Sequence, residues 1–333
     1  MGKPVQFAVL GGGSWATALV KMLAENIPEV IWYMRNEEAV AYIQKNGHNP
    51  NYLTDVTFNT KQLLLTSDIN EAITKAQVLI FAIPSAFLES ELKKIEHPLS
   101  DKIIFSAIKG IVPETGLIVG EHFHDHYDIA FEDIGVITGP CHAEEVALER
   151  LSYLTIACAD QDKARLVAEN LSSDYIRTKI SDDIIGTEYA AMLKNIYALA
   201  AGIAHGLGYG DNFLSVLMSN SIREIDRYIK RVHKMKRNIN NSAYLGDLLV
   251  TGYSTFSRNR MFGNMIGKGY TVSSAKMEMN MVAEGYYACK TAYELKSGFK
   301  KKVRTPIIDA VYEILYNNKN AKKIFRKLTE KLD

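Results

Sequence analysis

A glycine-rich turn near the N-terminus is the first segment whose residue types could bind a ligand. It has the pattern Gly11-x-Gly13-x-x-Ala16 and follows the apolar run Phe7–Leu10. The first glycine of such a turn permits a sharp change of direction, the second lets a pyrophosphate approach the backbone, and the small third residue lets a helix pack closely on the strand. The helix N-terminus then offers backbone N–H groups to the phosphates. Because a second apolar run follows at Val30–Tyr33, the pattern predicts dinucleotide binding rather than a purely structural turn.

Lys194 is the residue that the sequence favours for acid–base chemistry. It lies in Tyr189–Gly206, a run dominated by Ala, Ile, Leu and Gly. A lysine in so apolar a helix either extends its amine to water or is desolvated, and desolvation lowers its pKa towards the range useful for proton transfer. Asn195 beside it and Asp247 downstream are expected to orient the amine. We predict Lys194, Lys109 and Asp247 as catalytic residues.

Three consecutive donors, Ser257, Arg258 and Asn259, are suited to a phosphate monoester dianion. The planar guanidinium of an arginine can donate two parallel hydrogen bonds to the oxygens of a phosphate. We predict that these residues bind a phosphate group of the substrate. Arg260 is explained equally well as a cation on a helix surface.

Arg35 ends the second predicted strand, where an NAD-selective site usually places an acidic residue for the ribose 2′-hydroxyl. An arginine can instead bind a 2′-phosphate and stack on adenine. We therefore expect the protein to accept NADP, alone or together with NAD. A surface arginine at a strand end is the alternative.

Further strand ends supply more candidates. Pro84 ends a strand because proline cannot donate to a ladder, and Lys109 places an ammonium where the chain turns beside the cofactor. The segment Gly139–Ala143 precedes a predicted helix at Glu144–Arg150, and its backbone amides could hold substrate oxygens or the nicotinamide carboxamide. No motif places a base near Cys141, so covalent catalysis is not expected.

Two polar segments resemble sites but are better explained as surface. Glu121–Tyr127 carries His122, His124 and His126, which would align only on a strand, whereas the segment is expected to connect a helix to a strand. We therefore expect no metal. The basic stretch Lys319–Lys331 could touch anionic lipid as an amphipathic helix, but a solvated face is the better interpretation.

Composition narrows the class of protein. The chain has 333 residues, 47% apolar and 23% charged, as in a globular enzyme, and its net charge of +1 gives no reason to expect nucleic acid or an anionic membrane as partner. Three cysteines without a C-x-x-C pair indicate a reducing compartment. The N-terminus enters the first strand at once, without a signal peptide, and no apolar run approaches the roughly 18 residues of a membrane span. These features predict a soluble, cytoplasmic protein without stable membrane insertion.

The order of the predicted elements indicates an α/β fold with two domains. Apolar β runs alternate with helices in the first part, which predicts a parallel, doubly wound, Rossmann-like sheet in a dinucleotide-binding domain at 1–185. Helical periodicity then takes over, which predicts an all-α substrate-binding domain at 186–333. The predicted strands are Gln6–Leu10, Val30–Tyr33, Val78–Ala82, Lys102–Ser106, Ile134–Thr138 and Tyr153–Ala159. The predicted helices include Ser14–Asn26, Glu37–Lys45, Ala86–Lys94, Thr187–Gly206, Asn212–Val232 and Ala275–Lys296.

Together these motifs resemble the bacterial-type NAD(P)-dependent glycerol-3-phosphate dehydrogenase family over nearly the whole chain. The matching segments are GGGSWATAL from Gly11, Ile108-Lys109-Gly110, Gly139-Pro140, Leu193-Lys194-Asn195, Gly246-Asp247-Leu248, Ser257 to Arg260 with Phe262-Gly263, and Val282-Ala283-Glu284-Gly285. The resemblance implies NAD(P)H as cofactor, no metal, dihydroxyacetone phosphate and sn-glycerol 3-phosphate as substrates, and a cytoplasmic homodimer that supplies phospholipid synthesis.

The resemblance also implies roles for individual residues. Lys194 is the proton donor and acceptor, and Lys109 contacts both substrate and cofactor. The residues expected to bind substrate are Lys109, Gly139, Cys141, Lys194, Asp247, Ser257, Arg258 and Asn259. Those expected to bind the cofactor are Gly11, Gly13, Ser14, Trp15, Ala16, Arg35, Pro84, Lys109, Ala143, Arg258, Val282 and Glu284. The family more often has Ser or Thr at Cys141 and often Ser at Ala143, so only a backbone contact is expected at Cys141.

Two other functions fit the sequence less well. A two-domain β-hydroxyacid or ketopantoate-type reductase shares the Rossmann half, the helical half and a catalytic lysine, but it acts on a carboxylate and has no need of the donors at Ser257–Asn259. A non-catalytic NAD(P) sensor would have no use for Lys194 and Lys109, since several convergent polar groups are costly to keep without chemistry.

Overall fold

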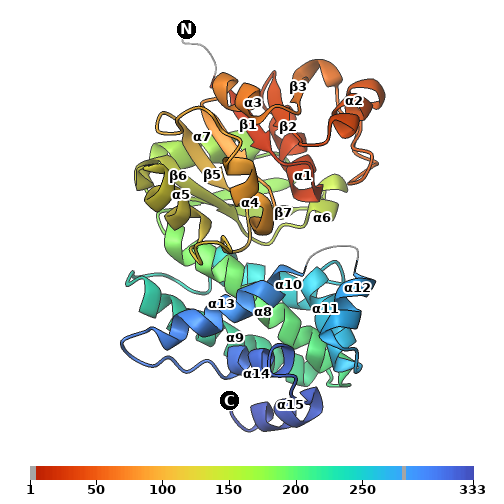
Figure 1. The fold of residues 1–333 in the computed structure, drawn as a ribbon, viewed down its shortest axis with the longest axis vertical. Helices are drawn as coiled ribbons and strands as arrows, with labels where there is room; N and C mark the ends of the chain where they lie inside the picture. The colour runs from red at the N-terminus through yellow and green to blue at the C-terminus, as the bar shows by residue number, and fades with distance from the viewer. Residues whose placement is uncertain (1–4, 280–282) are drawn as a thin grey trace. The chain divides into compact units, whose positions relative to one another are not determined.

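The computed structural model describes residues 5–279 and 283–333, which form two compact units, Met1–Ile185 and Gly186–Asp333 (Figure 1). The first unit contains the sheet and the second is helical. The dinucleotide-binding and substrate-binding roles expected of the two units remain predictions. Within the described residues, no helix is both long and apolar enough to cross a membrane.

One eight-stranded sheet organises the first unit, in the order β3-β2-β1-β4-β5-β6-β7-β8. The strands are β1 Phe7–Leu10, β2 Val30–Tyr33, β3 Leu63–Thr66, β4 Val78–Phe81, β5 Ile103–Ser106, β6 Ile134–Thr138, β7 Ser152–Cys158 and β8 Ile176–Ser181. All six predicted strands are present. β3 and β8 were not predicted: β3 is a four-residue edge strand, and β8 carries exposed polar residues that hide its pattern.

The prediction of a wholly parallel sheet is wrong at one pair, because β7 runs antiparallel to β6. The helix between them, α6 (Ala143–Ala147), has only five residues, fewer than the predicted Glu144–Arg150. Five residues of helix rise about 7.5 Å, which is too short to carry the chain back along a strand. The chain therefore re-enters the sheet from the end at which β6 finished.

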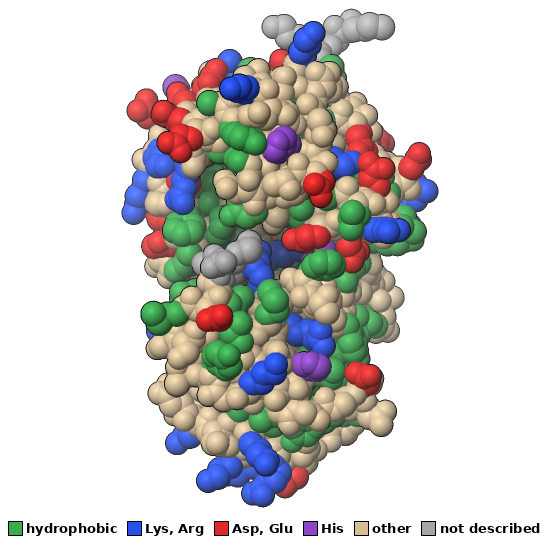
Figure 2. Space-filling view, turned by 90° about the vertical axis from the view of Figure 1, so that its right-hand side faces the viewer, with side chains coloured by type: hydrophobic (Ala, Val, Ile, Leu, Met, Phe, Trp, Pro, Cys, Tyr) green, Lys and Arg blue, Asp and Glu red, His purple; other side chains and the backbone are tan. Residues whose placement is uncertain are grey.

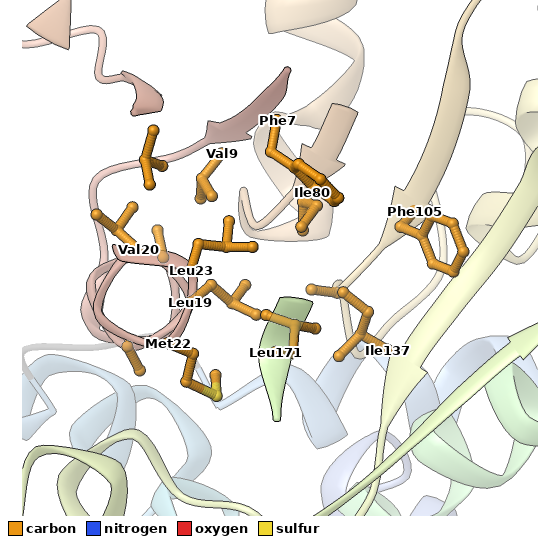
Figure 3. Packing of buried hydrophobic residues seen from close by; sticks show 14 of the residues in the cluster. Phe7, Val9, Leu19, Val20, Met22, Leu23, Ile80, Phe105, Ile137 and Leu171 are labelled. Carbon is orange, nitrogen blue, oxygen red and sulfur yellow. The ribbon is translucent and has the colours of Figure 1, made fainter. Parts of the chain in front are cut away.

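The helices of the first unit cover both faces of the sheet. They are α1 Ser14–Ala24, α2 Glu37–Asn46, α3 Ile69–Lys75, α4 Ser85–Leu92, α5 Val119–Tyr127, α6 and α7 Gln161–Leu171, with 3-10 turns η1 Thr60–Gln62 and η2 Phe131–Asp133. Val9 and Ile80 belong to one buried apolar cluster, while their strand neighbours Leu10 and Phe81 belong to another. Successive side chains of a strand point to opposite faces, so each face has its own core. In Figure 3, Leu23 of α1 points towards Val9, and Leu19 lies next to Leu171.

The histidine segment lies in helix α5 and not in a connection, which corrects the sequence prediction. His122 is buried, with Nε2 3.2 Å from Oε2 of Glu89 and Nδ1 3.3 Å from the Thr115 hydroxyl. Burial lowers the pKa of His122, against the opposing effect of Glu89. No group of three or more His, Cys, Asp or Glu side chains in residues 5–279 and 283–333 is arranged to hold a metal ion.

The second unit is built from helices. They are α8 Ile184–Gly206, α9 Asp211–Val232, the π-helix η3 Ser242–Gly246, α10 Asp247–Tyr253, α11 Arg258–Gly267, α12 Val272–Glu278, α13 Glu284–Ser297, α14 Pro306–Leu315 and α15 Ala321–Thr329. The predicted single helix Ala275–Lys296 is wrong. The extended backbone at Met279 ends α12, and α13 starts after Ala283.

Candidate functional site

The glycine turn between β1 and α1 has the conformation that the sequence pattern requires. Gly11 has φ +140°, and a Cβ there would lie 2.5 Å from the carbonyl oxygen of Ala82. A Cβ on Gly13 would meet nothing within 4 Å, so no protein packing demands this glycine. Ala16 is fully buried, as expected for the residue that packs α1 on the sheet. The turn therefore presents the N-terminus of α1 and an unobstructed backbone to a ligand.

Side chains from distant segments brace this turn. The indole Nε1 of Trp32 donates to the Gly11 carbonyl at 2.7 Å. Asn49, which is 1% exposed, donates to the Gly12 carbonyl at 3.2 Å and to the Thr17 hydroxyl at 2.9 Å. No sequence pattern predicts this role of Asn49, because an asparagine in a loop carries nothing that links it to a turn some 35 residues earlier.

Next to the turn lies a cavity of about 310 Å³. Arg35 and Pro84, both predicted to bind the cofactor, line it, and the Arg35 guanidinium lies 5.1 Å from the centre of the Phe87 ring. The remaining lining residues are Gly11, Gly12, Gly13, Tyr33, Met34, Asn36, Ala39, Asn49, Asn51, Tyr52, Ile83 and Glu91. A cavity of this size beside a glycine turn of this pattern fits the adenosine end of a dinucleotide.

Lys109 lies close to the same turn. Its ammonium is 5.2 Å from the centre of the Trp15 ring, and Trp15 follows Ser14, the first residue of α1. A Cβ on the next residue, Gly110, would lie 2.8 Å from the Ser85 hydroxyl, so a larger residue there would require Ser85 to move. Lys109 therefore lies near the glycine turn within this unit, and its contact with a cofactor stays a prediction.

The segment after β6 contains the other first-unit candidates. Gly139 has φ +123°, and a Cβ there would lie 2.7 Å from the Tyr153 carbonyl oxygen, so glycine is required. Cys141 is buried, and Ala143 is the first residue of α6. Because α6 has only five residues, its N-terminus is weaker as an anion site than predicted.

In the second unit, Lys194 and Asp247 form a buried ion pair between α8 and α10. Their side chains are 3% and 2% exposed. Lys194 is therefore buried and does not extend its amine to water. Asp247 provides the charge that an ammonium needs in so apolar a helix.

The helix that carries Lys194 is in backbone contact with α11. A Cβ on Gly202 would lie 2.1 Å from the Arg260 carbonyl oxygen, and one on Gly263 would lie 2.2 Å from the Leu199 carbonyl oxygen. Gly206 and Gly267 repeat this contact one turn further along, at 2.4 Å each. Glycines on both helices thus set the spacing between the helix of Lys194 and the helix that begins with Arg258.

The predicted phosphate donors lie at the N-terminus of α11. The Ser257 hydroxyl caps the helix by accepting the Arg260 N–H at 3.3 Å. Arg258 is the first helical residue and is partly exposed. The buried Asn259 uses its side-chain oxygen to accept the Gly285 N–H at 2.9 Å, so only its amide N–H groups could make the predicted contact with a phosphate. A helix N-terminus beside an arginine is a favourable place for an anion.

One of the last two cofactor candidates, Glu284, is the first residue of α13. Val282 lies outside the described residues. Gly285 packs against α8, since a Cβ there would lie 2.5 Å from the Asn195 carbonyl oxygen. Glu284 is therefore held next to the residue that follows Lys194.

Charge divides unevenly between the two units, although the whole chain is nearly neutral. Residues 186–333 contain 24 Lys and Arg against 12 Asp and Glu, whereas residues 1–185 contain 15 against 26. Figure 2 shows Lys and Arg side chains gathered at the end of the helical unit where α15 lies. The unit with the predicted phosphate donors therefore has a field that attracts anions.

Comparison with known proteins places both halves of the chain in one family. A model of the N-terminal part of NAD-dependent glycerol-3-phosphate dehydrogenase matches residues 6–164, and a model of the C-terminal part matches residues 183–326. A glycerol-3-phosphate dehydrogenase [NAD(P)+] of an Exiguobacterium species is 37% identical over 323 residues, which cover 96% of this chain and 94% of the relative. The corresponding protein of Listeria monocytogenes is 36% identical over 320 residues, which cover 95% of this chain and 93% of the relative.

The fold leads to the same family. The crystal structure of glycerol-3-phosphate dehydrogenase from Coxiella burnetii superposes with a TM-score of 0.88 at 26% identity, covering 98% of this chain and 99% of that one. This agreement confirms the predicted fold class, a Rossmann-like unit followed by a helical one. The family models and the relatives confirm the resemblance drawn from the motifs. The chain belongs to the NAD-dependent glycerol-3-phosphate dehydrogenase family.

Proposed function

We propose that the protein reduces dihydroxyacetone phosphate to sn-glycerol 3-phosphate, reversibly and with NAD(P)H, and so supplies glycerophospholipid synthesis. We further propose that it works as a cytoplasmic homodimer. The observation that supports the chemistry best is the buried pair Lys194–Asp247, in the same unit as the donors at the start of α11.

The first unit holds the cofactor in this proposal. The backbone of Gly11–Gly13 and the start of α1, with Ser14 and Trp15, bind the pyrophosphate, and the cavity beside Arg35 and Pro84 takes the adenosine. When bound, NAD(P)H supplies the hydride that reduces the substrate carbonyl. Lys109, Ala143, Arg258, Val282 and Glu284 are proposed as further cofactor contacts.

Lys194 is the general acid and base in this proposal. As an ammonium it donates a hydrogen bond to the substrate carbonyl oxygen and gives up its proton as that oxygen gains negative charge. Asp247 keeps the amine charged and orients it, because the carboxylate is buried against it. In the oxidation direction the neutral amine takes the proton from the substrate hydroxyl.

The phosphate is bound at the start of α11. Arg258 and the amide N–H groups of Asn259 donate to it, with Ser257 holding the helix end in shape. Binding energy gained at the phosphate, away from the reacting carbon, fixes the carbonyl in position. Lys109 places a positive charge beside the substrate, and the backbone N–H groups at Gly139 and Cys141 are further hydrogen-bond donors.

The test measures the loss of reduced-nicotinamide absorbance with dihydroxyacetone phosphate and with phosphate-free dihydroxyacetone, each with NADH and with NADPH. Rapid loss with the phosphorylated ketone only is the expected result. Equal rates with both ketones would contradict phosphate binding by Arg258 and Asn259. No loss with either ketone would leave the carboxylate reductase and the redox sensor as the functions to examine.

A further inference from the structure

The cavity beside the glycine turn contains a carboxylate that no sequence pattern predicts. Glu91 of α4 lines this cavity together with Arg35, and Glu91 is 3% exposed. Its Oε2 accepts the Tyr33 hydroxyl at 2.5 Å, and its Oε1 lies 2.8 Å from the Lys94 ammonium. A buried carboxylate and a guanidinium therefore border one small space.

The Glu91 carboxylate is held firmly in place. Tyr33 is itself buried, and burial together with Glu91 raises the pKa of its hydroxyl well above the usual value, so the hydroxyl stays a donor. The charges of both Glu91 and Arg35 act on this hydroxyl, the first raising and the second lowering its pKa, so both groups lie within electrostatic reach of it. A carboxylate has about four lone-pair sites. Glu91 can therefore still accept a hydroxyl from a ligand while it is bound to Tyr33 and Lys94.

Arg35 and Glu91 favour opposite forms of the cofactor. Arg35 stands at the strand end where NAD-selective proteins usually carry an acidic residue for the ribose 2′-hydroxyl. A guanidinium there attracts the 2′-phosphate of NADPH. Glu91 brings a carboxylate into the same cavity from a different element, and a carboxylate accepts from a 2′-hydroxyl but repels a 2′-phosphate.

We propose that Glu91, positioned by Tyr33, determines how strongly the protein discriminates between NADH and NADPH, by opposing Arg35 within the adenosine cavity. This proposal rests on the proposed cofactor role of the first unit but not on any substrate. Glu91 thus supplies, from α4, the acidic group that the end of β2 lacks.

The experiment measures dissociation constants of NADH and NADPH for the intact chain, by fluorescence titration at low ionic strength without a ketone. Glu91→Gln removes the charge and keeps an oxygen that accepts the Tyr33 hydroxyl. We expect this variant to bind NADPH about five- to tenfold more tightly relative to NADH than the unchanged protein does. The gain should shrink as salt is added, because the repulsion is screened.

Glu89→Gln is the matched control. Glu89 lies two residues earlier on α4, does not line the cavity and faces His122 instead. The Glu89→Gln variant removes the same charge from the same helix. We expect it to change the ratio of the NADPH and NADH affinities less than twofold. Arg35→Gln should move the ratio in the direction opposite to Glu91→Gln.

The outcomes separate this proposal from the cofactor assignment itself. A ratio within twofold of the unchanged protein in Glu91→Gln, or the same shift in Glu89→Gln, would overturn the proposal. If Glu91→Gln lowers the melting temperature too far for titration, Tyr33→Phe gives a second test. In this variant the affinities for 2′,5′-ADP and 5′-AMP are compared by competition, and we expect a shift towards 2′,5′-ADP. An unchanged ratio of the two affinities would contradict the proposal. Failure of the unchanged protein to bind either cofactor would instead overturn the proposed function.

Discussion

The side-chain oxygen of Asn259 accepts the backbone N–H of Gly285 at 2.9 Å and so joins the start of α11 to the start of α13. Gly285 in turn packs on the backbone of Asn195 in α8. Three helices therefore meet at the immediate neighbours of Lys194, Arg258 and Glu284, the residues proposed for proton transfer, phosphate binding and cofactor contact. Asn259 has a structural task in addition to its proposed role in phosphate binding.

The two tasks of Asn259 can be separated by substitution. Asn259→Asp keeps an oxygen that accepts the Gly285 N–H but places a negative charge near the proposed phosphate site. We expect a melting temperature close to that of the unchanged protein and a KM for dihydroxyacetone phosphate at least about tenfold higher. Asn259→Ala should lose both stability and affinity. A normal KM in Asn259→Asp would show that this residue does not face the phosphate.

Replacing Lys194 should abolish turnover and also reduce stability. Lys194→Met leaves Asp247 buried without its cation, which costs about 3–5 kcal/mol, and we expect kcat to fall by about 10³-fold. NADH binding should stay within twofold, since the cofactor turn belongs to the other unit. The double variant Lys194→Met/Asp247→Asn should recover stability but not turnover. Turnover within tenfold of normal in Lys194→Met would remove this residue from the mechanism.

Arg258 should account for the preference for a phosphorylated substrate. In Arg258→Gln we expect kcat/KM for dihydroxyacetone phosphate to fall by about 10- to 100-fold, which corresponds to a lost hydrogen bond to a charged group. The slow reaction with dihydroxyacetone, measured at saturating cofactor, should change much less. Arg260→Gln is the control, because the Arg260 guanidinium donates to the Tyr253 carbonyl at 3.1 Å. Equal losses in both variants would point to a general effect of positive charge.

The glycine contact between α8 and α11 should resist even one added methyl group. A Cβ on Gly202 lies 2.1 Å from a backbone oxygen, so the helices must separate. We expect Gly202→Ala to lower the free energy of unfolding by about 1–3 kcal/mol or more and to lower kcat/KM by at least about tenfold. Gly298→Ala is the control, since its nearest neighbour lies at 3.5 Å in ordinary contact. Unchanged thermal melting of Gly202→Ala would contradict the close packing.

Stability should depend on pH through Glu224. This fully buried carboxyl accepts the N–H groups of Ile307 and Ile308 at the start of α14, and burial raises its pKa from 4.5 to about 7. The protonated form is favoured by folding, so its stabilising effect is full below pH 4.5 and is lost as the pH rises to about 7. The difference amounts to about 3 kcal/mol.

Urea unfolding at pH 5, 6.5 and 8 checks this effect. Glu224→Gln cannot titrate, so we expect its stability relative to the unchanged protein to rise by about 3 kcal/mol between pH 5 and pH 8. The lowered pKa of His122 has the opposite sign, because it favours folding at higher pH, but it is common to both proteins and cancels in the comparison. A constant difference between the two proteins across this range would refute a raised pKa at Glu224.

Much of the first unit could be predicted from local sequence. The turn Gly11–Ala16 and the fully apolar strands beside it can be predicted from adjacent residues. Glycines mark the backbone conformation of the turn, and a run of apolar residues marks a strand that is buried on both faces. For Lys194 the apolar helix leaves two alternatives, desolvation or extension to water, and the structure shows that the side chain is buried. The family resemblance also rests on such short, local motifs.

Other features were decided only by tertiary structure. The antiparallel β7 depends on how short α6 is, and the exposed strand β8 lacks the apolar pattern that prediction relies on. Asn49 reaches the glycine turn, Glu91 reaches the cavity beside that turn, and Asn259 reaches α13, each across a long stretch of chain. A polar side chain carries no mark of its distant partner, because that partner is chosen by the packing of whole elements and not by neighbouring residues.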